Sequence, residues 1–155
     1  MSNAFMSKVI RMSLENVREG RGGPFAALVV KDGQIVGAGT NQVTSANDPT
    51  AHAEIVAIRE ASKLLETFQL TGCDVYCTCE PCPMCLGALY WARPSRIFYA
   101  ATRQDAADIG FSDAFIYDQL ELPVTKRSLP MSQIMRQEAL VAFQYWKQKP
   151  DKITY

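Results

Sequence analysis

Two stretches decide how this chain folds: Pro49-Thr50-Ala51-His52-Ala53-Glu54 and, further along, Glu80-Pro81-Cys82-Pro83-Met84-Cys85. Zinc prefers nitrogen and sulfur ligands in a tetrahedron, and a catalytic zinc site keeps three protein ligands and leaves the fourth position to water. His52, Cys82 and Cys85 supply such a set of three. Glu54 lies two residues from the histidine and is then free to carry protons. The two stretches together predict a catalytic metal site.

Each half of this motif lies at the start of a predicted helix. The first helix is expected over 51–65, with Asp48 or Thr50 as its cap. Its inward residues are expected to be Ile55, Ile58, Ala61 and Leu65. The second helix is expected over 83–91, because proline suits the first turn of a helix. In open α/β sheets such helix N-termini meet at the carboxyl ends of strands, and their partial positive charge lowers the pKa of a cysteine.

The order of the remaining elements predicts an α/β fold. The expected elements are a helix over 7–20, strands over 25–30 and 34–40 joined by a turn at 31–33, a polar loop over 41–50, and strands over 74–79 and 97–100. Beyond them we expect a short helix over 104–108, a loop over 110–113 that leads into 114–119, a fifth strand over 126–129 and a helix over 131–147. This order predicts a mixed sheet of about five strands with helices on its faces.

The composition indicates one soluble, globular domain. The chain has 155 residues, 48% of them apolar, and a formal net charge of zero. Zero net charge argues weakly against a nucleic-acid partner, and no apolar run approaches the roughly 20 residues of a membrane helix. We expect the domain to cover 6–155, because Ser2-Asn3-Ala4 is typical of an expression-tag remnant and Met6 of a natural start.

Five cysteines raise the question of disulfides. Their odd number, the absence of a visible secretory signal and the size of the core favour reduced thiols and a cytoplasmic location. A Cys-x-x-Cys pair alone is also typical of structural zinc, of a redox pair or of buried core cysteines. Cys79 is the candidate fourth ligand for a closed structural site, whereas Cys73 and Cys77 are expected in the core.

His52-Ala53-Glu54 and Pro81-Cys82-Pro83-Met84-Cys85 resemble the signature of the zinc-dependent nucleobase deaminases. Within that superfamily the chain resembles the bacterial guanine deaminases of cytidine deaminase-like fold. The narrower likeness is carried by the stretches 22–25, 47–54, 79–88 and 110–117, and it extends to the terminal Tyr155. The last stretch and the terminal tyrosine distinguish the chain from tRNA adenosine deaminases, which share both zinc motifs.

The resemblance implies a three-layer α/β/α fold and the hydrolysis of guanine to xanthine and ammonia by a zinc-activated water that attacks C2, in purine catabolism or salvage. It implies that Glu54 shuttles protons and that the protein is a homodimer, often domain-swapped, in which Tyr155 closes a site. The residues implied at the substrate are Phe25, Asn41, Ala53, Asp113 and Tyr155, with Asp113 also catalytic.

The chemistry of these side chains agrees with a purine. A carboxylate such as Asp113 accepts hydrogen bonds from the N1–H and amino group of guanine, and the Asn41 amide can serve O6 and N7. Phe25 can stack on the ring. Simpler roles remain open: Asn41 as a loop brace, Asp113 as a helix cap and Phe25 as core.

Two other functions compete with this interpretation. A tRNA adenosine deaminase must hold an anticodon loop and needs basic residues around its pocket. The loops expected here are instead acidic, with Asp48, Asp105, Asp108, Asp113 and Asp118 in or beside them. A non-enzymatic module with structural zinc would need four protein ligands. Triazines and other aminopurines share the donor and acceptor edge of guanine and remain possible substrates.

Overall fold

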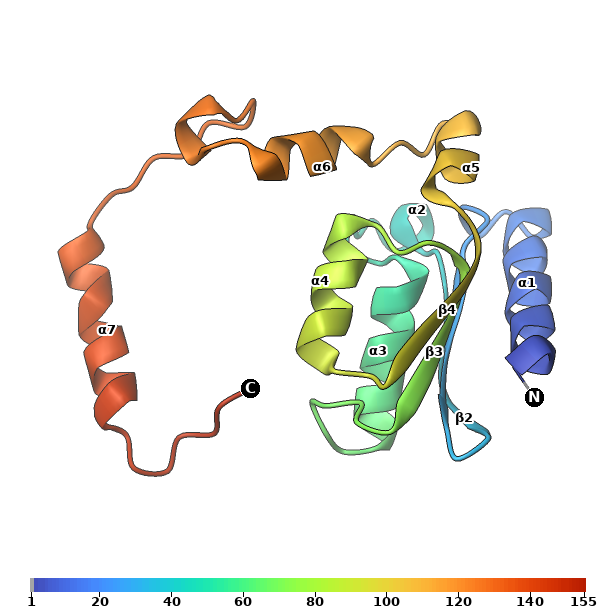
Figure 1. Ribbon diagram of the computed structural model, residues 1–155, viewed down its shortest axis with the longest axis horizontal. Helices are drawn as coiled ribbons and strands as arrows, with labels where there is room; N and C mark the ends of the chain where they lie inside the picture. Colours follow the sequence, from blue (N-terminus) through green and yellow to red (C-terminus); the bar gives the residue numbers. More distant parts are fainter. Residues whose placement is uncertain (1) are drawn as a thin grey trace. The chain divides into compact units, whose positions relative to one another are not determined.

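The computed structural model describes residues 2–155, except for the side chain of Ser2 (Figure 1). The chain divides into two compact units, one ending at Asp113 and the other covering 114–155. The first unit holds a four-stranded sheet in the order β2-β1-β3-β4. Its strands are β1 (Ala26–Lys31), β2 (Gln34–Thr40), β3 (Cys73–Cys79) and β4 (Arg96–Ala101).

The sheet is mixed, as the sequence predicts. β1 pairs antiparallel with β2 and with β3, and β3 pairs parallel with β4. The β1–β2 hairpin turns at Asp32 and Gly33, whose φ angles are 49° and 77°. Two positive φ angles are typical of the two-residue turns that match the twist of a hairpin.

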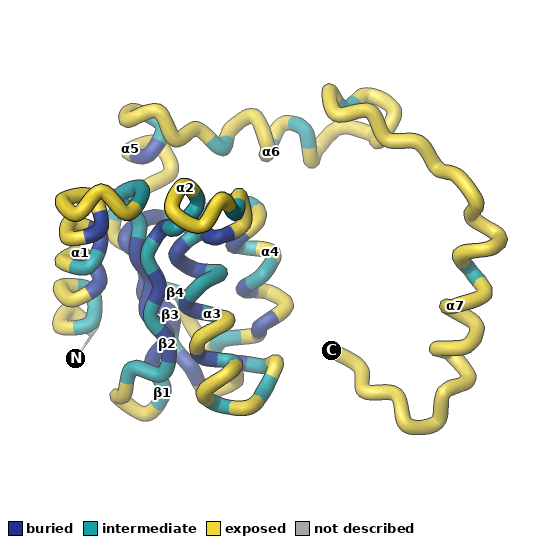
Figure 2. The backbone as a smooth tube through the Cα atoms, turned by 180° about the vertical axis from the view of Figure 1, so that it is seen from behind, coloured by how far each residue is buried: buried dark blue, intermediate teal, exposed yellow. Residues whose placement is uncertain are grey.

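Helices cover both faces of the sheet and give the expected three layers (Figure 1). Helix α1 (Ser2–Arg18) packs on one face, while α3 (Ala53–Leu64) and α4 (Pro83–Ala92) lie on the other. Strand β1 is buried on both sides, because its residues alternate between two cores (Figure 2). The core under α1 contains Val9, Ala26, Leu28, Val30 and Tyr76, and the core under α3 and α4 contains Ala27, Val29, Ala57, Val75 and Leu89.

Helix α3 lies unusually close to β2. A Cβ atom at Gly37 would overlap the carbonyl oxygen of Ala57, and one at Gly39 would overlap that of Ala53. Small residues on both surfaces therefore let the helix backbone approach the strand. For this reason the buried residues of α3 are Ala53, Glu54, Ala57 and Ala61. Of the predicted inward residues, Ala61 is buried, Ile58 and Leu65 are half-buried against the same core, and Ile55 does not belong to it.

The first helix extends further toward the N-terminus than expected. Although residues 1–5 are left out of the sequence-based fold, α1 begins at Ser2, and Phe5 packs on Tyr76 with ring centroids 5.4 Å apart. Tyr76 stacks in turn on Phe98 at 4.8 Å. The prediction of one domain over 6–155 stays a prediction.

The remaining elements differ from the sequence prediction mainly after Asp113. A one-turn helix, α2 (Val43–Ala46), interrupts the expected loop over 41–50, and α5 (Arg103–Asp108) lies where a short helix is predicted. The second unit contains α6 (Ala114–Glu121), the short 3₁₀ helix η1 (Val124–Lys126) and α7 (Arg136–Gln148). No residue of 114–155 is buried (Figure 2).

The predicted fifth strand over 126–129 is wrong. The chain there leaves η1 and continues without regular structure to Pro130. Two prolines, Pro123 and Pro130, flank this short and largely polar stretch, and a proline lacks the N–H that a sheet ladder needs. The sheet therefore has four strands. Among residues 2–155, no helix is long and apolar enough to cross a membrane.

Candidate active site

Three side chains converge at the starts of α3 and α4. The Sγ atoms of Cys82 and Cys85 each lie 3.5 Å from Nδ1 of His52. The three potential ligand atoms lie within 4.8 Å of one another. One nitrogen and two sulfurs at this spacing fit a tetrahedral zinc ion, which prefers such donors. The predicted metal ligands are thus together in space.

The local backbone explains why these residues meet. His52 is the N-cap of α3 and Cys82 the N-cap of α4, and both have extended backbone conformations. Neither side chain caps its own helix, so the imidazole and the thiol stay available as ligands. Pro83 begins α4, and Cys85 follows in the same first turn. Two helix N-termini therefore direct their partial positive charge toward sulfur ligands that bind metal as thiolates.

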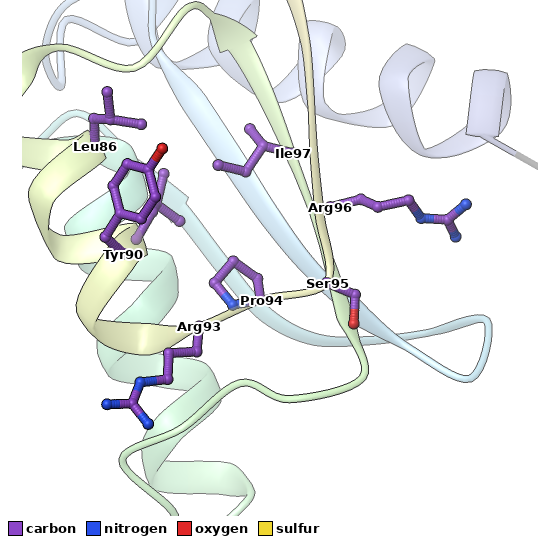
Figure 3. A pocket seen from close by; sticks show the side chains of 8 residues that line it. Leu86, Tyr90, Arg93, Pro94, Ser95, Arg96 and Ile97 are labelled. Carbon is purple, nitrogen blue, oxygen red and sulfur yellow. The ribbon is translucent and has the colours of Figure 1, made fainter. Parts of the chain in front are cut away.

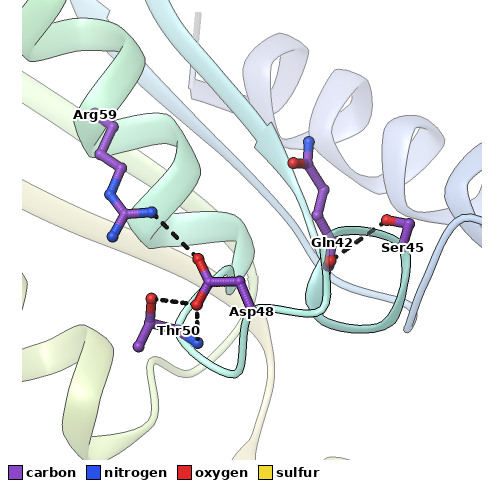
Figure 4. Close-up of polar contacts among 5 residues, drawn as sticks. All are labelled: Gln42, Ser45, Asp48, Thr50 and Arg59. Atoms are coloured by element: carbon purple, nitrogen blue, oxygen red, sulfur yellow. Dashed lines mark hydrogen bonds and ion pairs between the residues drawn. The ribbon is translucent and has the colours of Figure 1, made fainter.

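The predicted N-cap of α3, Asp48 or Thr50, is wrong, because His52 occupies that position. Asp48 stabilises the turn before the helix instead. Its Oδ1 accepts hydrogen bonds from the backbone N–H of Thr50 at 2.8 Å and from Thr50 Oγ1 at 2.7 Å, and these bonds lower the pKa of the carboxyl group (Figure 4). Arg59, which lies further along α3, has its guanidinium 3.7 Å from Asp48 Oδ2. Asp48 thus fixes the turn that leads into His52.

The two sulfurs of the cluster differ in acidity. A hydrogen bond with Cys85, together with one to His52, lowers the pKa of Cys82 to about 4 despite its burial. The same bond and burial raise the pKa of the Cys85 thiol. The hydrogen bond with Cys82 raises the pKa of His52. Without a metal the trio shares its protons, and metal binding must displace them.

Glu54 lies in the first turn of α3 and is 8% exposed. Burial raises the pKa of its carboxyl group, and the neighbouring Cys82 sulfur raises it further. A buried carboxyl group with a raised pKa beside a metal site is typical of a residue that moves protons.

The other cysteines do not belong to this cluster. The thiol of Cys79 lies 3.4 Å from the carbonyl oxygen of Thr102, and burial raises its pKa to about 11. The group of potential metal ligands consists of His52, Cys82 and Cys85 and does not include Cys79 as a fourth ligand. Cys73 and Cys77 lie in the core under α3 and α4, as predicted, and all five cysteines are free thiols.

Asn41 lies at the end of β2 and is 8% exposed. Its side-chain oxygen accepts from the backbone N–H of Gly23 at 3.4 Å and of Val43 at 3.3 Å. The next residue, Gln42, donates its N–H to the carbonyl oxygen of Ala51, directly before His52. Asn41 is therefore both the expected loop brace and a neighbour of the segment that carries the histidine.

Phe25, directly before β1, is half-buried and meets Phe111 edge to face. Ala53 is buried against Gly39. Asp113 is half-buried just before α6, and burial raises the pKa of its carboxyl group, with a further contribution from the negative charge of Cys82. That influence indicates that Asp113 lies near the cluster. Tyr155 belongs to the second unit, and its part in the site stays a prediction.

Two residues escape the sequence-based prediction. Phe111 follows a loop glycine, so no periodicity marks it as a partner of Phe25. Asn16 is fully buried in α1. It lies seven residues after the core residue Val9, and a polar residue at that position of an apolar helix face is a signal that could have revealed it.

The comparisons with known proteins agree with this site. The family described as the cytidine and deoxycytidylate deaminase zinc-binding region matches residues 1–101. The guanine deaminase of Bacillus subtilis (strain 168) is 50% identical over 151 residues, which cover 97% of each chain. The X-ray structure of a Bacillus subtilis guanine deaminase superposes with a TM-score of 0.96 at 49% identity, covering 99% of this chain and 98% of the other.

A tRNA-specific adenosine deaminase of Aquifex aeolicus is 45% identical, but over only 78 residues, which are 50% of this chain and 52% of the relative. That match covers about half of the sequence, whereas the guanine deaminase match extends over almost all of it. The chain belongs to the zinc-dependent guanine deaminases, hydrolases of the cytidine and deoxycytidylate deaminase zinc-binding family with the cytidine deaminase-like fold.

Proposed function

We propose that this protein hydrolyses guanine to xanthine and ammonia. The observation that carries the proposal is the cluster of His52, Cys82 and Cys85 beside the buried Glu54, in a chain similar to a guanine deaminase over 97% of its length. A zinc ion held by these three ligands would act as a Lewis acid and make water nucleophilic at neutral pH.

Glu54 is the residue that moves protons. It takes a proton from the attacking water and delivers it to the ring nitrogen beside C2, and it then carries the second proton to the departing amino group. The C2–O bond forms and the C2–N bond breaks, so that water and guanine become xanthine and ammonia. The raised pKa of Glu54 suits both steps, because the carboxyl group must hold and release a proton near neutral pH.

Three further residues bind the base in this proposal. Asp113 accepts hydrogen bonds from N1–H and the amino group, Asn41 donates to O6 and N7, and Phe25 stacks on the ring. The hydrogen bonds of Asn41 support its role, because two backbone N–H groups engage its Oδ1 and leave the amide N–H donors for a substrate. Ala53 forms the wall next to His52.

An ammonia-release assay tests the substrate. The panel is guanine, adenine, cytosine, their nucleosides and a tRNA anticodon hairpin, with wild-type protein and Asp113→Asn. We expect turnover of guanine and a severe loss in Asp113→Asn at unchanged zinc content. Release from the hairpin but not from guanine would overturn the proposal, and equal losses of zinc and activity would reduce Asp113 to a structural role.

We also propose a homodimer, and a surface of the first unit supports it. On α4 and β4, Tyr90 is 77% exposed, Trp91 64% and Tyr99 52%. A hollow between these elements is lined by Leu86, Leu89, Tyr90, Arg93, Pro94, Ser95, Arg96 and Ile97, which do not include the metal ligands (Figure 3). β4 is also an edge strand of the sheet. Exposed apolar surface of this kind is typical of a protein interface.

The segment 114–155 supports a swapped arrangement, since none of its residues is buried and a segment of this size rarely forms a core alone. Complementation tests it: a Glu54→Gln chain is mixed, after unfolding, with a chain that ends at Thr154. If Tyr155 closes the partner's site, the mixture regains activity that neither parent has; an inactive mixture of confirmed heterodimers argues against the swap. The cytoplasm is the compartment we propose, because all five cysteines are free thiols.

A further inference from the structure

Asn16 joins three segments of the first unit through one buried amide. It lies in α1 and is 0% exposed. Its Nδ2 donates to the carbonyl oxygen of Gly23 at 2.9 Å and to that of Asn41 at 3.1 Å. One carbonyl precedes β1 and the other follows β2, so the amide fixes both ends of the hairpin against the helix.

These two segments carry the residues that the proposed function places on the base. The backbone N–H of Asn41 donates to the carbonyl oxygen of Phe25 at 3.0 Å. The N–H groups of Gly23 and Val43 hold the Oδ1 of Asn41, which sets the orientation of its amide. Within the described residues, the Nδ2 of Asn41 has no hydrogen-bond partner. Its two donors remain for an acceptor outside the chain.

The contact around Asn41 leaves little space. A Cβ atom at Gly22 would overlap the carbonyl oxygen of Asn41 and would lie 3.0 Å from its Oδ1. The backbone at 22–23 therefore presses against the side chain and the carbonyl of Asn41, while Asn16 ties those two segments to α1.

Packing alone does not account for an asparagine at position 16. The Oδ1 of Asn16 is buried and has no hydrogen-bond partner among the described residues. Burying an unsatisfied polar atom destabilises the fold, and a leucine of similar size would avoid that cost. The two hydrogen bonds that the Nδ2 of Asn16 donates offset this cost.

We infer that Asn16 is a positioning residue for purine recognition: it fixes the carbonyl of Asn41 so that the Asn41 amide presents its two N–H donors to O6 and N7 of the base. The inference rests on the proposed function, in which Asn41 binds guanine. Asn16 itself touches no substrate and acts through Asn41.

A double-mutant cycle tests the inference with guanine as the substrate. The variants are Asn16→Leu, Asn41→Ala and the combination, and Ser13→Ala serves as the matched control. Ser13 lies on the same helix, and its hydroxyl bonds within α1, to the carbonyl oxygen of Ile10 at 2.8 Å. We expect Asn16→Leu to raise KM about tenfold, equivalent to about 1.4 kcal/mol, with a smaller change in kcat and unchanged zinc content.

The decisive result is non-additivity. If Asn16 acts through Asn41, the combined variant has the same KM as Asn41→Ala alone, because the residue being positioned is gone. Multiplied effects on KM, or a shift as large in Ser13→Ala, would overturn the inference. If Asn41→Ala leaves KM unchanged, the proposed role of Asn41 fails instead. Should Asn16→Leu not fold, the cycle runs with Asn16→Ala, which loses the donors and introduces neither bulk nor charge.

Discussion

Phe25 and Phe111 meet edge to face, with ring centroids 5.0 Å apart and ring planes at 89°. The contact joins the start of β1 to the segment two residues before Asp113. Such a pair contributes about 0.5–1.5 kcal/mol beyond its buried area. It therefore holds the ring proposed to stack on the base in a fixed position.

Replacing Phe111 should weaken guanine binding. In Phe111→Ala the ring of Phe25 loses its partner, so we expect KM to rise about tenfold with little change in kcat. Steady-state kinetics measure the change, with Phe111→Leu as the control that keeps apolar contact and most of the affinity. An unchanged KM in Phe111→Ala would show that the aromatic contact has no part in binding.

Glu54→Gln should slow turnover severely without emptying the metal site. The amide keeps the shape but cannot accept and release a proton, so kcat should fall by a factor on the order of 10²–10⁴. Elemental analysis should find the same zinc content as in the wild type, because Glu54 is not one of the three grouped ligands. A variant with normal kcat would remove Glu54 from the mechanism.

Zinc affinity should fall as the pH is lowered. His52 binds metal only when its imidazole is neutral, and its pKa is raised above the ordinary 6.5 by the bond to Cys82. Protons therefore compete with the metal already near neutral pH, and they compete increasingly below it. Competition with a chromophoric chelator from about pH 8 to about pH 5.5 measures the effect. An affinity that does not change over this range would contradict the predicted ligand set.

Two glycines should respond to alanine in opposite directions. In Gly37→Ala the new methyl group would lie 2.8 Å from the Cβ of Ala61 and overlap the Ala57 carbonyl, so we expect a loss of about 1–3 kcal/mol in unfolding free energy. Gly87 is exposed within α4, and a methyl group at its Cα would meet no atom within 4 Å, so Gly87→Ala should add about 0.5–1 kcal/mol. Urea unfolding measures both variants. A neutral Gly37→Ala would mean that α3 can move away from the sheet.

The metal ligands were predictable from the sequence because local features determine their positions. His52 and Cys82 each precede a helix, and Pro83 marks the first turn of α4, so spacing along the chain translates directly into position. The same holds for the β1–β2 hairpin, whose turn at Asp32-Gly33 is encoded by the residues in it.

Other features depend on contacts between distant segments, which periodicity does not reveal. The inward face of α3 is set by Gly37 and Gly39 in β2, so alanines are buried at the closest approach, whereas Ile58 is only half-buried against the core and Ile55 lies outside it. The expected strand over 126–129 needs a neighbouring strand to pair with, and its residues alone cannot supply one. The role of Asn16 likewise depends on the carbonyl groups of Gly23 and Asn41, which lie further along the chain.

The close seating of α3 on β2 has a practical consequence for protein engineering. Because backbone meets backbone there, the helix that carries Glu54 and follows His52 offers almost no freedom for enlarging the pocket. Libraries that aim at bulkier or differently substituted heterocycles should instead vary Phe25 and the segment 111–113, which meet through side chains and not through backbone.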